Sequence, residues 1–399
     1  MEITVNNEKK QKYQNFNGTF RYCTFALAIA LIYPNPSRRV KKIKFMVFCL
    51  IILSVSFVLL WFISYLYFCY IARDMFNFTR NMTVGIVIFL FFFKTFYLNY
   101  KSDGFGVVMD AISDDLVKAN DMDEVYQEIF DTYIKKGLVA QMIWIFIPIV
   151  QTCIFPVHAG LTMFFNLINE VPQPRVMVLE MDILMVRSKQ MESPWFEIVW
   201  FYTILGGFVL FPNFIGFDGS YCISVNHLCL KLRVLTEKLR RAFAETTTDE
   251  QLEKRVKEVI KEHQASLVYY NLLQDVFGGW MFVVFFITSL EITFNLYQLS
   301  LGGMDPKYLI FAFSTVVHNF VPCYFCTRLI EHGDDFCEAL YMMPWEARHC
   351  QSVTRALAFM IARTQGPLFL TGMGMVTFNM ELFVSVMQSS YSFFTLIRD

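Results

Sequence analysis

The last residues of the chain carry hydroxyl groups at helical spacing within an otherwise apolar segment. At steps of three and four residues come Ser385, Ser389, Ser392, then Thr395 or Leu396, and Asp399. On a helix this spacing places the residues in one narrow stripe. Hydroxyl groups can hydrate a passing ion, whereas lipid offers them no hydrogen-bonding partner. The stripe therefore predicts a helix that faces protein or water, as the wall of a pore does.

Few other residues in the apolar segments could do chemistry. Glu291 and Glu381 are carboxylates inside predicted spans, where an ionisable side chain is a functional hypothesis by default, although Glu381 could equally pair locally or cap a helix. His318 is expected to be a hydrogen-bonded core residue. Cys323 and Cys326 have the spacing of half a zinc site, but no second pair or histidine cluster accompanies them. The sequence therefore predicts no metal site, no cofactor and no enzyme activity.

The composition is typical of an integral membrane protein. The 399 residues are 55% hydrophobic and include 44 Phe, and 17% are charged, against roughly 25% in ordinary globular chains. The net charge of −1 implies no nucleic-acid partner. The apolar run 22–33 is shorter than the about 20 residues that a spanning helix needs. We expect this run to dip into the membrane or to lie at its surface.

Seven apolar runs are long enough to cross a bilayer as helices. The seventh contains a break at 371–374, which leaves open whether it forms two half-helices. The expected fold class is therefore an all-α integral membrane protein with seven transmembrane helices. The runs are 45–71, 82–100, 137–161, 196–217, 267–301, 308–327 and 367–397.

The distribution of positive charge orients these spans. Most of the 34 Lys and Arg residues lie before the first span or in the loops after the second, fourth and sixth, and cytoplasmic loops are enriched in such residues. The N-terminus is thus predicted in the cytoplasm and the C-terminus outside. Glycosylation sequons at Asn77 and Asn81 fall in the first loop, which this topology makes extracellular. A sequon at Asn17 falls on the predicted inner side, and we attribute it to chance.

The segment between the fourth and fifth spans has its own pattern. Leu228, Leu232, Leu235 and Leu239 recur at helical spacing, and a polar turn follows at 245–249. This pattern predicts that the two spans continue as a helical hairpin, either a cytoplasmic assembly region, which we favour, or a pair of membrane-surface helices. The expected regions are a cytoplasmic N-terminus with the membrane-dipping run (1–42), helices one to four (43–217), the hairpin (218–266), helices five and six (267–331), a cytoplasmic segment (332–366) and the pore-lining seventh helix (367–399).

The predicted architecture and the last residues together resemble the insect odorant receptors. The ending is Ser-Tyr-Ser-Phe-Phe-Thr-Leu-Ile-Arg at 390–398, and the run Thr-Gln-Gly-Pro-Leu at 364–368 and the segment 378–383 are also similar. The resemblance covers the whole chain in architecture, while its motifs are concentrated near the C-terminus. The related gustatory receptors end in a different pattern that this chain lacks, which favours the odorant branch.

The resemblance implies a function. It implies an odorant-binding subunit of a tetrameric, ligand-gated, non-selective cation channel, which assembles with a shared coreceptor and opens on binding a small hydrophobic volatile. Monovalent and divalent cations would pass through a pore lined by the last span, and subunits would contact one another through the cytoplasmic ends of spans four to seven. The expected location is the plasma membrane, as a multi-pass protein of the dendritic cilia of olfactory neurons.

The resemblance also places an odorant pocket in the outer half of the membrane, among spans two, three, four and six. An aromatic and aliphatic lining with one or two hydroxyl groups suits a small volatile, because burial supplies most of the affinity. Each lining residue could instead pack helix against helix. The implied residues are Ile88, Phe91, Phe146, Ile149, Val150, Cys153, Trp200, Thr203, Gly207 and Thr315.

The resemblance gives the C-terminal stripe its expected roles. Leu396 matches an apolar gate position of the family, and rings of apolar side chains can close a pore by dewetting. Asp399 would lie at the outer mouth and favour cations. Ser385, Ser389 and Ser392 would hydrate ions, or would form hydrogen bonds between helices.

Other classes of membrane protein fit the sequence less well. A G-protein-coupled receptor also has seven spans, but it has its N-terminus outside and carries Asp-Arg-Tyr and Asn-Pro-x-x-Tyr motifs that are absent here. A transporter would show an internal repeat, and none is seen. A gustatory-receptor-type channel of the same superfamily is the remaining alternative.

Overall fold

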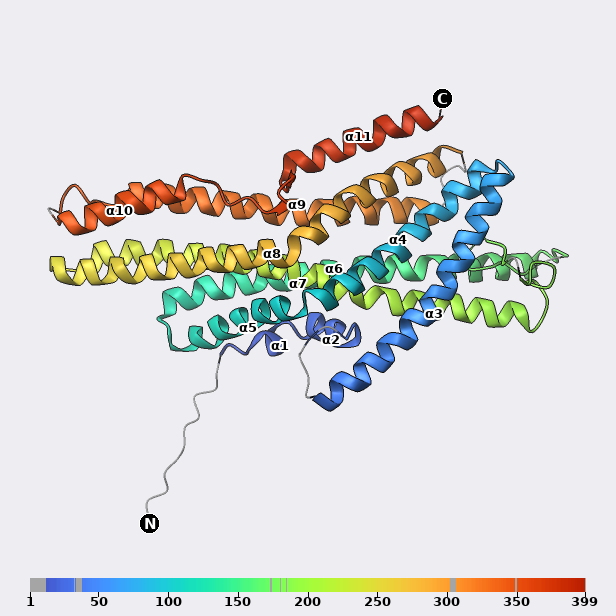
Figure 1. Cartoon of the computed structure of the whole chain (residues 1–399), viewed down its shortest axis with the longest axis horizontal. Coiled ribbons are helices and arrows are strands. Elements are labelled where there is room, and N and C mark those ends of the chain that lie inside the picture. Colours follow the sequence, from blue (N-terminus) through green and yellow to red (C-terminus); the bar gives the residue numbers. More distant parts are fainter. Residues whose placement is uncertain are drawn as a thin grey trace, which may run out of the picture.

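The computed structural model describes residues 12–31, 33, 38–172, 174–179, 181–183, 185–301, 306–348 and 350–398. In Figure 1, α6, α7, α8 and α9 run along the long axis of the molecule, α3 crosses them obliquely, and α11 lies along one edge. The elements are α1 (Phe16–Thr19), α2 (Arg21–Ile29), α3 (Arg38–Ile71), α4 (Met75–Tyr100), α5 (Ser102–Lys118), a 3-10 turn η1 (Ala119–Asp121), α6 (Glu124–Ile168), α7 (Trp195–Glu245), α8 (Asp249–Leu301), α9 (Pro306–Tyr341), α10 (Gln351–Thr364), β1 (Thr371–Gly372), β2 (Val376–Thr377) and α11 (Met380–Arg398).

Six helices in the described part of the chain are long and apolar enough to cross a membrane: α3, α4, α6, α7, α8 and α9. They contain the first six predicted spans. Because α7 has 51 residues, it is about 77 Å long at 1.5 Å per residue, more than twice the roughly 30 Å of a bilayer core. Much of α7, and likewise of the 53-residue α8, therefore extends beyond any membrane as a two-helix hairpin.

The seventh predicted span divides into a hairpin and a single helix. The break at 371–374 does not separate two half-helices, because β1 and β2 pair antiparallel with Thr371 opposite Thr377. The hairpin is held on α8, where the Gln274 amide donates to the Thr371 carbonyl at 2.6 Å and accepts its N–H at 2.8 Å. Met373 and Gly374 have positive φ angles of 52° and 72°, which the tight turn between the strands requires. Helix α11 begins after this hairpin, at Met380.

The short apolar run near the N-terminus packs on the bundle. It forms α2, whose Cys23 and Leu27 are fully buried. A Cβ on Gly216 of α7 would lie 2.9 Å from the Leu27 nitrogen, so α2 and α7 approach closely because this position is a glycine. The opposite face of α2 exposes apolar side chains such as Phe25.

Outside the spans, α5 is tied to α7 by a shared carboxylate. Asp115 Oδ2 accepts a hydrogen bond from Lys231 Nζ at 2.6 Å and lies 3.0 Å from His227 Nε2. Burial alone would raise the pKa of Asp115, but the hydrogen bond with His227 and the positive charge of Lys231 outweigh burial and hold that pKa well below its usual range. The carboxylate therefore stays charged at neutral pH.

A fully buried ion pair lies within the bundle. Lys94 Nζ of α4 is 2.5 Å from Asp218 Oδ2 of α7, and both side chains have 0% exposure. His318 Nε2 of α9 is 3.3 Å from the same oxygen, and Lys94 Nζ also lies 3.8 Å from the centroid of the Phe214 ring. Each isolated charge would cost several kcal/mol to bury, and this cost is offset only when the partner is in place. The pair therefore fixes the position of α4 against α7.

We predict that Lys94→Met lowers the free energy of unfolding by about 3–5 kcal/mol, because Asp218 is left as an uncompensated buried charge. The double variant Lys94→Met/Asp218→Leu is expected to recover most of this loss. Thermal unfolding of the purified protein in detergent measures both.

The matched control is Lys101→Met, which breaks the partly exposed Lys101–Asp275 pair, 2.7 Å long. It is expected to cost less than about 1 kcal/mol. A double variant as unstable as Lys94→Met alone would contradict the interpretation.

Candidate ligand pocket and pore face

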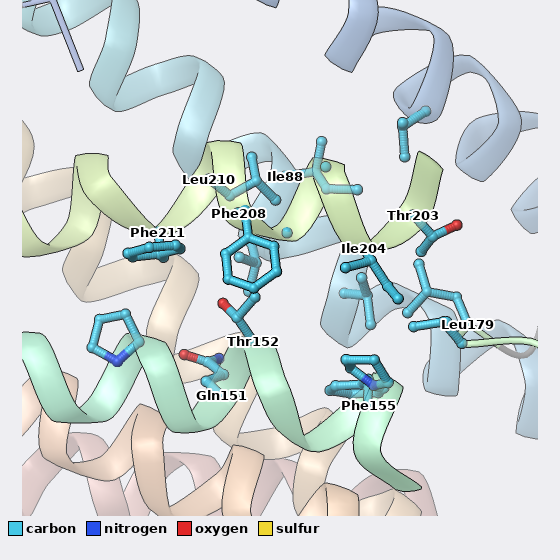
Figure 2. Close-up of a pocket in the computed structure, with 18 of the residues that line it drawn as sticks. Ile88, Gln151, Thr152, Phe155, Leu179, Thr203, Ile204, Phe208, Leu210 and Phe211 are labelled. Atoms are coloured by element: carbon cyan, nitrogen blue, oxygen red, sulfur yellow. The ribbon is translucent and has the colours of Figure 1, made fainter. Parts of the chain in front are cut away.

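A small apolar cavity of 130 Å³ lies among α3, α4, α6, α7 and α9. Apolar cavities of about 150 Å³ in other proteins hold benzene, so this one suits a molecule of similar size. Figure 2 shows Phe208 and Ile204 of α7 facing Thr152 and Phe155 of α6 across it. The lining is Val55, Val58, Val84, Val87, Ile88, Pro148, Gln151, Thr152, Phe155, Pro156, Val178, Leu179, Thr203, Ile204, Gly206, Gly207, Phe208, Leu210, Phe211, Phe214 and Phe311.

Helices α6 and α7 supply most of this lining. On α6 the lining residues include Pro148, Gln151, Thr152 and Phe155, whose steps of three and four residues place them on one helical face. Val178 and Leu179, from the segment that joins α6 to α7, close one side. The cavity is therefore formed mainly between α6 and α7.

Two adjacent glycines on α7 have different surroundings. A Cβ on Gly207 would lie 2.9 Å from Thr152 Cγ2, so the absence of a side chain lets α6 and α7 approach. A Cβ on Gly206 would meet no atom within 4 Å, and Gly206 lines the cavity. The first glycine permits helix packing and the second leaves cavity space open.

Three side chains with hydrogen-bonding groups line the otherwise apolar cavity: Gln151, Thr152 and Thr203. The Thr203 hydroxyl donates to the Val199 carbonyl at 2.7 Å, which leaves its oxygen free to accept a hydrogen bond. Figure 2 shows Gln151 and Thr152 next to each other on α6. An apolar enclosure with a few polar groups is the usual composition of a small-molecule site, in which burial gives affinity and the polar groups set orientation.

Three of the ten residues implied by the resemblance line the cavity: Ile88, Thr203 and Gly207. Phe91 is buried in the apolar cluster between α3 and α4, and Trp200 packs against the same cluster. Thr315 is buried beside Glu291 of α8 rather than in the cavity. The ligand contacts of all ten stay predictions.

The other four implied residues, on α6, lie outside the lining: Phe146, Ile149, Val150 and Cys153. Phe146 is 69% exposed on the outer surface of the bundle. Each of the four lies two residues before a residue of α6 that lines the cavity. A step of two residues along an α-helix turns the side-chain direction by about 200°, so the four point away from the cavity. Gln151, a polar residue within an apolar span, is the sequence signal that could have identified the face of α6 that lines the cavity.

The predicted stripe on α11 lies on the exposed side of this helix. Ser385, Ser389 and Ser392 are exposed, and Leu396 is 74% exposed. The opposite side is buried, and there the Ser390 hydroxyl donates to the Ser289 carbonyl of α8 at 3.0 Å. Asp399 lies outside the described residues. The stripe is thus free of contacts to α8, as a pore face of a single subunit would be.

Glu381, Cys323 and Cys326, which the sequence also singled out, lie in positions where they serve helix packing or face the surface. Glu381 is exposed in the first turn of α11, and Asn379 caps that helix by accepting the Leu382 N–H at 2.8 Å. Cys326 Sγ is 2.9 Å from the Tyr221 hydroxyl, and Cys323 is buried. Among the residues that the structure describes, no group of three or more His, Cys, Asp or Glu is placed to hold a metal ion.

Both predicted glycosylation sites lie in the first two turns of α4. Asn81 is 3% exposed, and its amide donates to the Asn77 carbonyl at 2.9 Å. The Asn77 amide donates to Asp74 Oδ2 at 2.5 Å. In this fold the Asn81 amide is not open to the attachment of a glycan.

The long apolar helices and the cavity among them define the class: a multi-pass α-helical membrane protein with a small apolar internal cavity. The family model described as 7tm Odorant receptor matches residues 74–391, and the chain belongs to this insect odorant receptor family. The resemblance to insect odorant receptors is thereby confirmed, and solved structures of the same fold confirm the largely helical, seven-transmembrane fold class.

Relatives in Drosophila melanogaster are similar over part of their length. Odorant receptor 22a is 26% identical over 172 residues, which are 42% of this chain and 43% of that protein. Odorant receptor 13a is 24% identical over 228 residues, 52% of this chain and 54% of that protein. The chain thus spans about half the length of the relatives it matches.

Solved structures extend the comparison to nearly the whole chain. The insect olfactory receptor OR5 from Machilis hrabei in complex with eugenol has a TM-score of 0.74 at 15% identity and covers 96% of both chains. A second structure of the same receptor has a TM-score of 0.73 and covers 96% of this chain and 97% of that one. At this identity the likeness shows a shared fold.

We predict that Gly207→Ala lowers the free energy of unfolding by about 1–3 kcal/mol, because the new methyl group overpacks the α6–α7 contact. Adding Thr152→Ser, which removes the methyl group that is 2.9 Å from that position, is expected to restore stability. Thermal unfolding in lipid nanodiscs measures the effect. Gly206→Ala is the control and is expected to change little; equal effects at the two glycines would refute the packing argument.

Proposed function

We propose that this chain is an odorant-binding subunit of a ligand-gated, non-selective cation channel, assembled with a shared coreceptor. The observation that carries the proposal is the small apolar cavity, with Gln151, Thr152 and Thr203 in its lining, inside a chain of the odorant receptor family. A neutral volatile gains its binding free energy by leaving water for such a cavity, at about 25 cal/mol for each Å² of apolar surface buried.

The class of ligand follows from the cavity. Its volume of 130 Å³ and apolar lining favour a small hydrophobic volatile with one or two polar groups. No charged side chain is among the described residues that line it, so a charged ligand would lose its hydration without a counter-charge. The solved structure of OR5 with eugenol supports a small organic ligand in this fold.

The channel part of the proposal rests on α11. If four subunits surround one axis with α11 innermost, Ser385, Ser389 and Ser392 face the pore and Leu396 forms an apolar ring. Asp399 would then add negative charge at the outer mouth and favour monovalent and divalent cations. The hairpin of α7 and α8 serves as the cytoplasmic assembly region, and the location is the plasma membrane of olfactory cilia.

The function is tested by electrophysiology on cells that express this chain with the coreceptor. We predict that a panel of volatiles includes one that evokes a cation current in excised patches without GTP. Gly206→Leu, which extends a side chain into the cavity, is expected to raise the half-maximal concentration between about tenfold and a hundredfold, since it takes up the space that buries the ligand.

Gly160→Leu is the matched control, because a Cβ on Gly160 also meets no atom within 4 Å and Gly160 is not in the lining. A current that needs a G-protein cascade would exclude the channel. Equal shifts for the two leucine variants would exclude this cavity as the ligand site.

For the gate, we predict that Leu396→Ala raises the basal conductance of the assembled channel, because a smaller side chain leaves the apolar ring wider and easier to hydrate. Current without ligand, blocked by a pore blocker, is the measurement. The control is Tyr391→Ala, at a residue of α11 that is also exposed but lies off the stripe. Unchanged leak and unchanged gating in Leu396→Ala would remove this residue as the gate.

A further inference from the structure

A second cavity, of 650 Å³, lies between α6, α7 and α9. Its α6 residues run from Tyr133 to Ile143 and therefore precede the ligand pocket, which begins at Pro148. Its α9 residues run from Phe320 to His332. The cavity thus lies on the side of the ligand pocket that faces the α7–α8 hairpin and has its own set of residues.

One end of this cavity is positively charged. Lys135, Lys136 and Arg328 line it, and no carboxylate is among the described residues of the lining. Lys136 Nζ lies 4.4 Å from the centroid of the Tyr133 ring, and Arg328 is close enough to repel it electrostatically. Arg328 is paired with Glu331 outside the cavity. Two cations that face the same space and repel each other form a site that an anion would stabilise.

The neutral polar groups at this end are already paired. His332 Nδ1 donates to the Arg328 carbonyl at 2.7 Å, so its Nε2 accepts a hydrogen bond from the Tyr133 hydroxyl. The Asn226 amide donates to the Tyr133 carbonyl at 2.8 Å. Arg328 gives one nitrogen, Nη1, to Glu331, so the two lysines and the other N–H donors of the Arg328 guanidinium are the groups available to an incoming ligand.

The other end of the cavity is apolar. On α6, the apolar residues Val139 and Ile143 come after Lys136 in the sequence. On α9, which runs in the opposite direction, the apolar residues Phe320 and Val321 come before Arg328. At the side, Val139 is 60% exposed and Tyr324 is 44% exposed, so this end opens on the surface that a bilayer would cover. Both helices thus change from basic to apolar in the same direction, which is the order of groups in a phospholipid.

We propose that this cavity binds an anionic phospholipid. Its phosphate-bearing head group would lie against Lys136 and Arg328, and the first part of an acyl chain would lie along Val139 and Ile143. Basic pockets between transmembrane helices bind anionic head groups in this way. In the predicted topology this is the cytoplasmic leaflet, where such lipids are concentrated. A free phosphate would use the same cations but would leave the apolar end empty.

The test is photo-crosslinking of the full chain, assembled with the coreceptor, in phosphatidylcholine nanodiscs that contain phosphatidylserine with a photoreactive acyl chain. Labelling is expected on 139–143 of α6 and around Phe320 of α9. Lys136→Gln and Arg328→Gln are each expected to weaken labelling about fivefold, the factor that corresponds to about 1 kcal/mol per basic residue near an anionic bilayer. Lys136→Arg is expected to keep it.

Lys254→Gln, an equal charge change on the exposed hairpin, is the control and is expected to leave the labelling unchanged. Soluble glycerophosphoserine is expected to compete only weakly, since it lacks the acyl chain. Full competition by this head group would replace the lipid with a free phosphate ligand and overturn the proposal. Equal labelling in Lys136→Gln and Lys254→Gln, or labelling by photoreactive phosphatidylcholine to the same extent, would also overturn it.

Discussion

The ion pair between Lys94 and Asp218 is the interaction on which the rest of the bundle depends. Neither side chain is exposed, so separating the two would leave a charge in a medium of low polarity, at a cost of several kcal/mol. The pair holds α4 against α7, and His318 of α9 lies 3.3 Å from the same carboxylate. Phe214 joins this arrangement to the cavity, because its ring lies 3.8 Å from Lys94 Nζ and also lines the cavity. The Phe214 side chain therefore contacts both the apolar cavity and the buried ion pair.

Helix α8 connects this centre to the proposed pore helix. Glu291 of α8 is buried and interacts electrostatically with Lys94. Two residues earlier on the same helix, the Ser289 carbonyl accepts a hydrogen bond from the Ser390 hydroxyl of α11 at 3.0 Å. Phe214, Lys94 and α8 therefore lie in sequence between the apolar cavity and α11. The serine–carbonyl contact is a neutral hydrogen bond worth about 1 kcal/mol, and beside it the Thr293 hydroxyl donates to the Ser390 carbonyl at 3.4 Å.

The sequence predicted where the helices lie, but not which face of each helix lines the apolar cavity. Length and hydropathy located the spans because a bilayer imposes both. The predicted fourth span ended one residue before Asp218, because a hydropathy scale scores a carboxylate as polar and takes no account of its pairing with Lys94. On α6, apolar residues occupy all sides, so nothing in the pattern distinguished Gln151 and Phe155 from Ile149 and Cys153. The hairpin at 371–377 depends on Gln274, a residue far away in sequence, and no local signal beyond the glycines could report this contact.

The two cavities of the bundle differ in the ligands that they can hold, although α6, α7 and α9 line both. An anionic lipid that entered the first would lose the hydration of its phosphate with no cation in the lining to replace it. A neutral volatile that entered the second would displace water from Lys136 and leave its ammonium group without a hydrogen-bonding partner. The same helices can therefore serve an apolar ligand on one side of the buried ion pair and a charged one on the other. The placement of a few lysines and arginines along α6 and α9 is sufficient to separate the two sites.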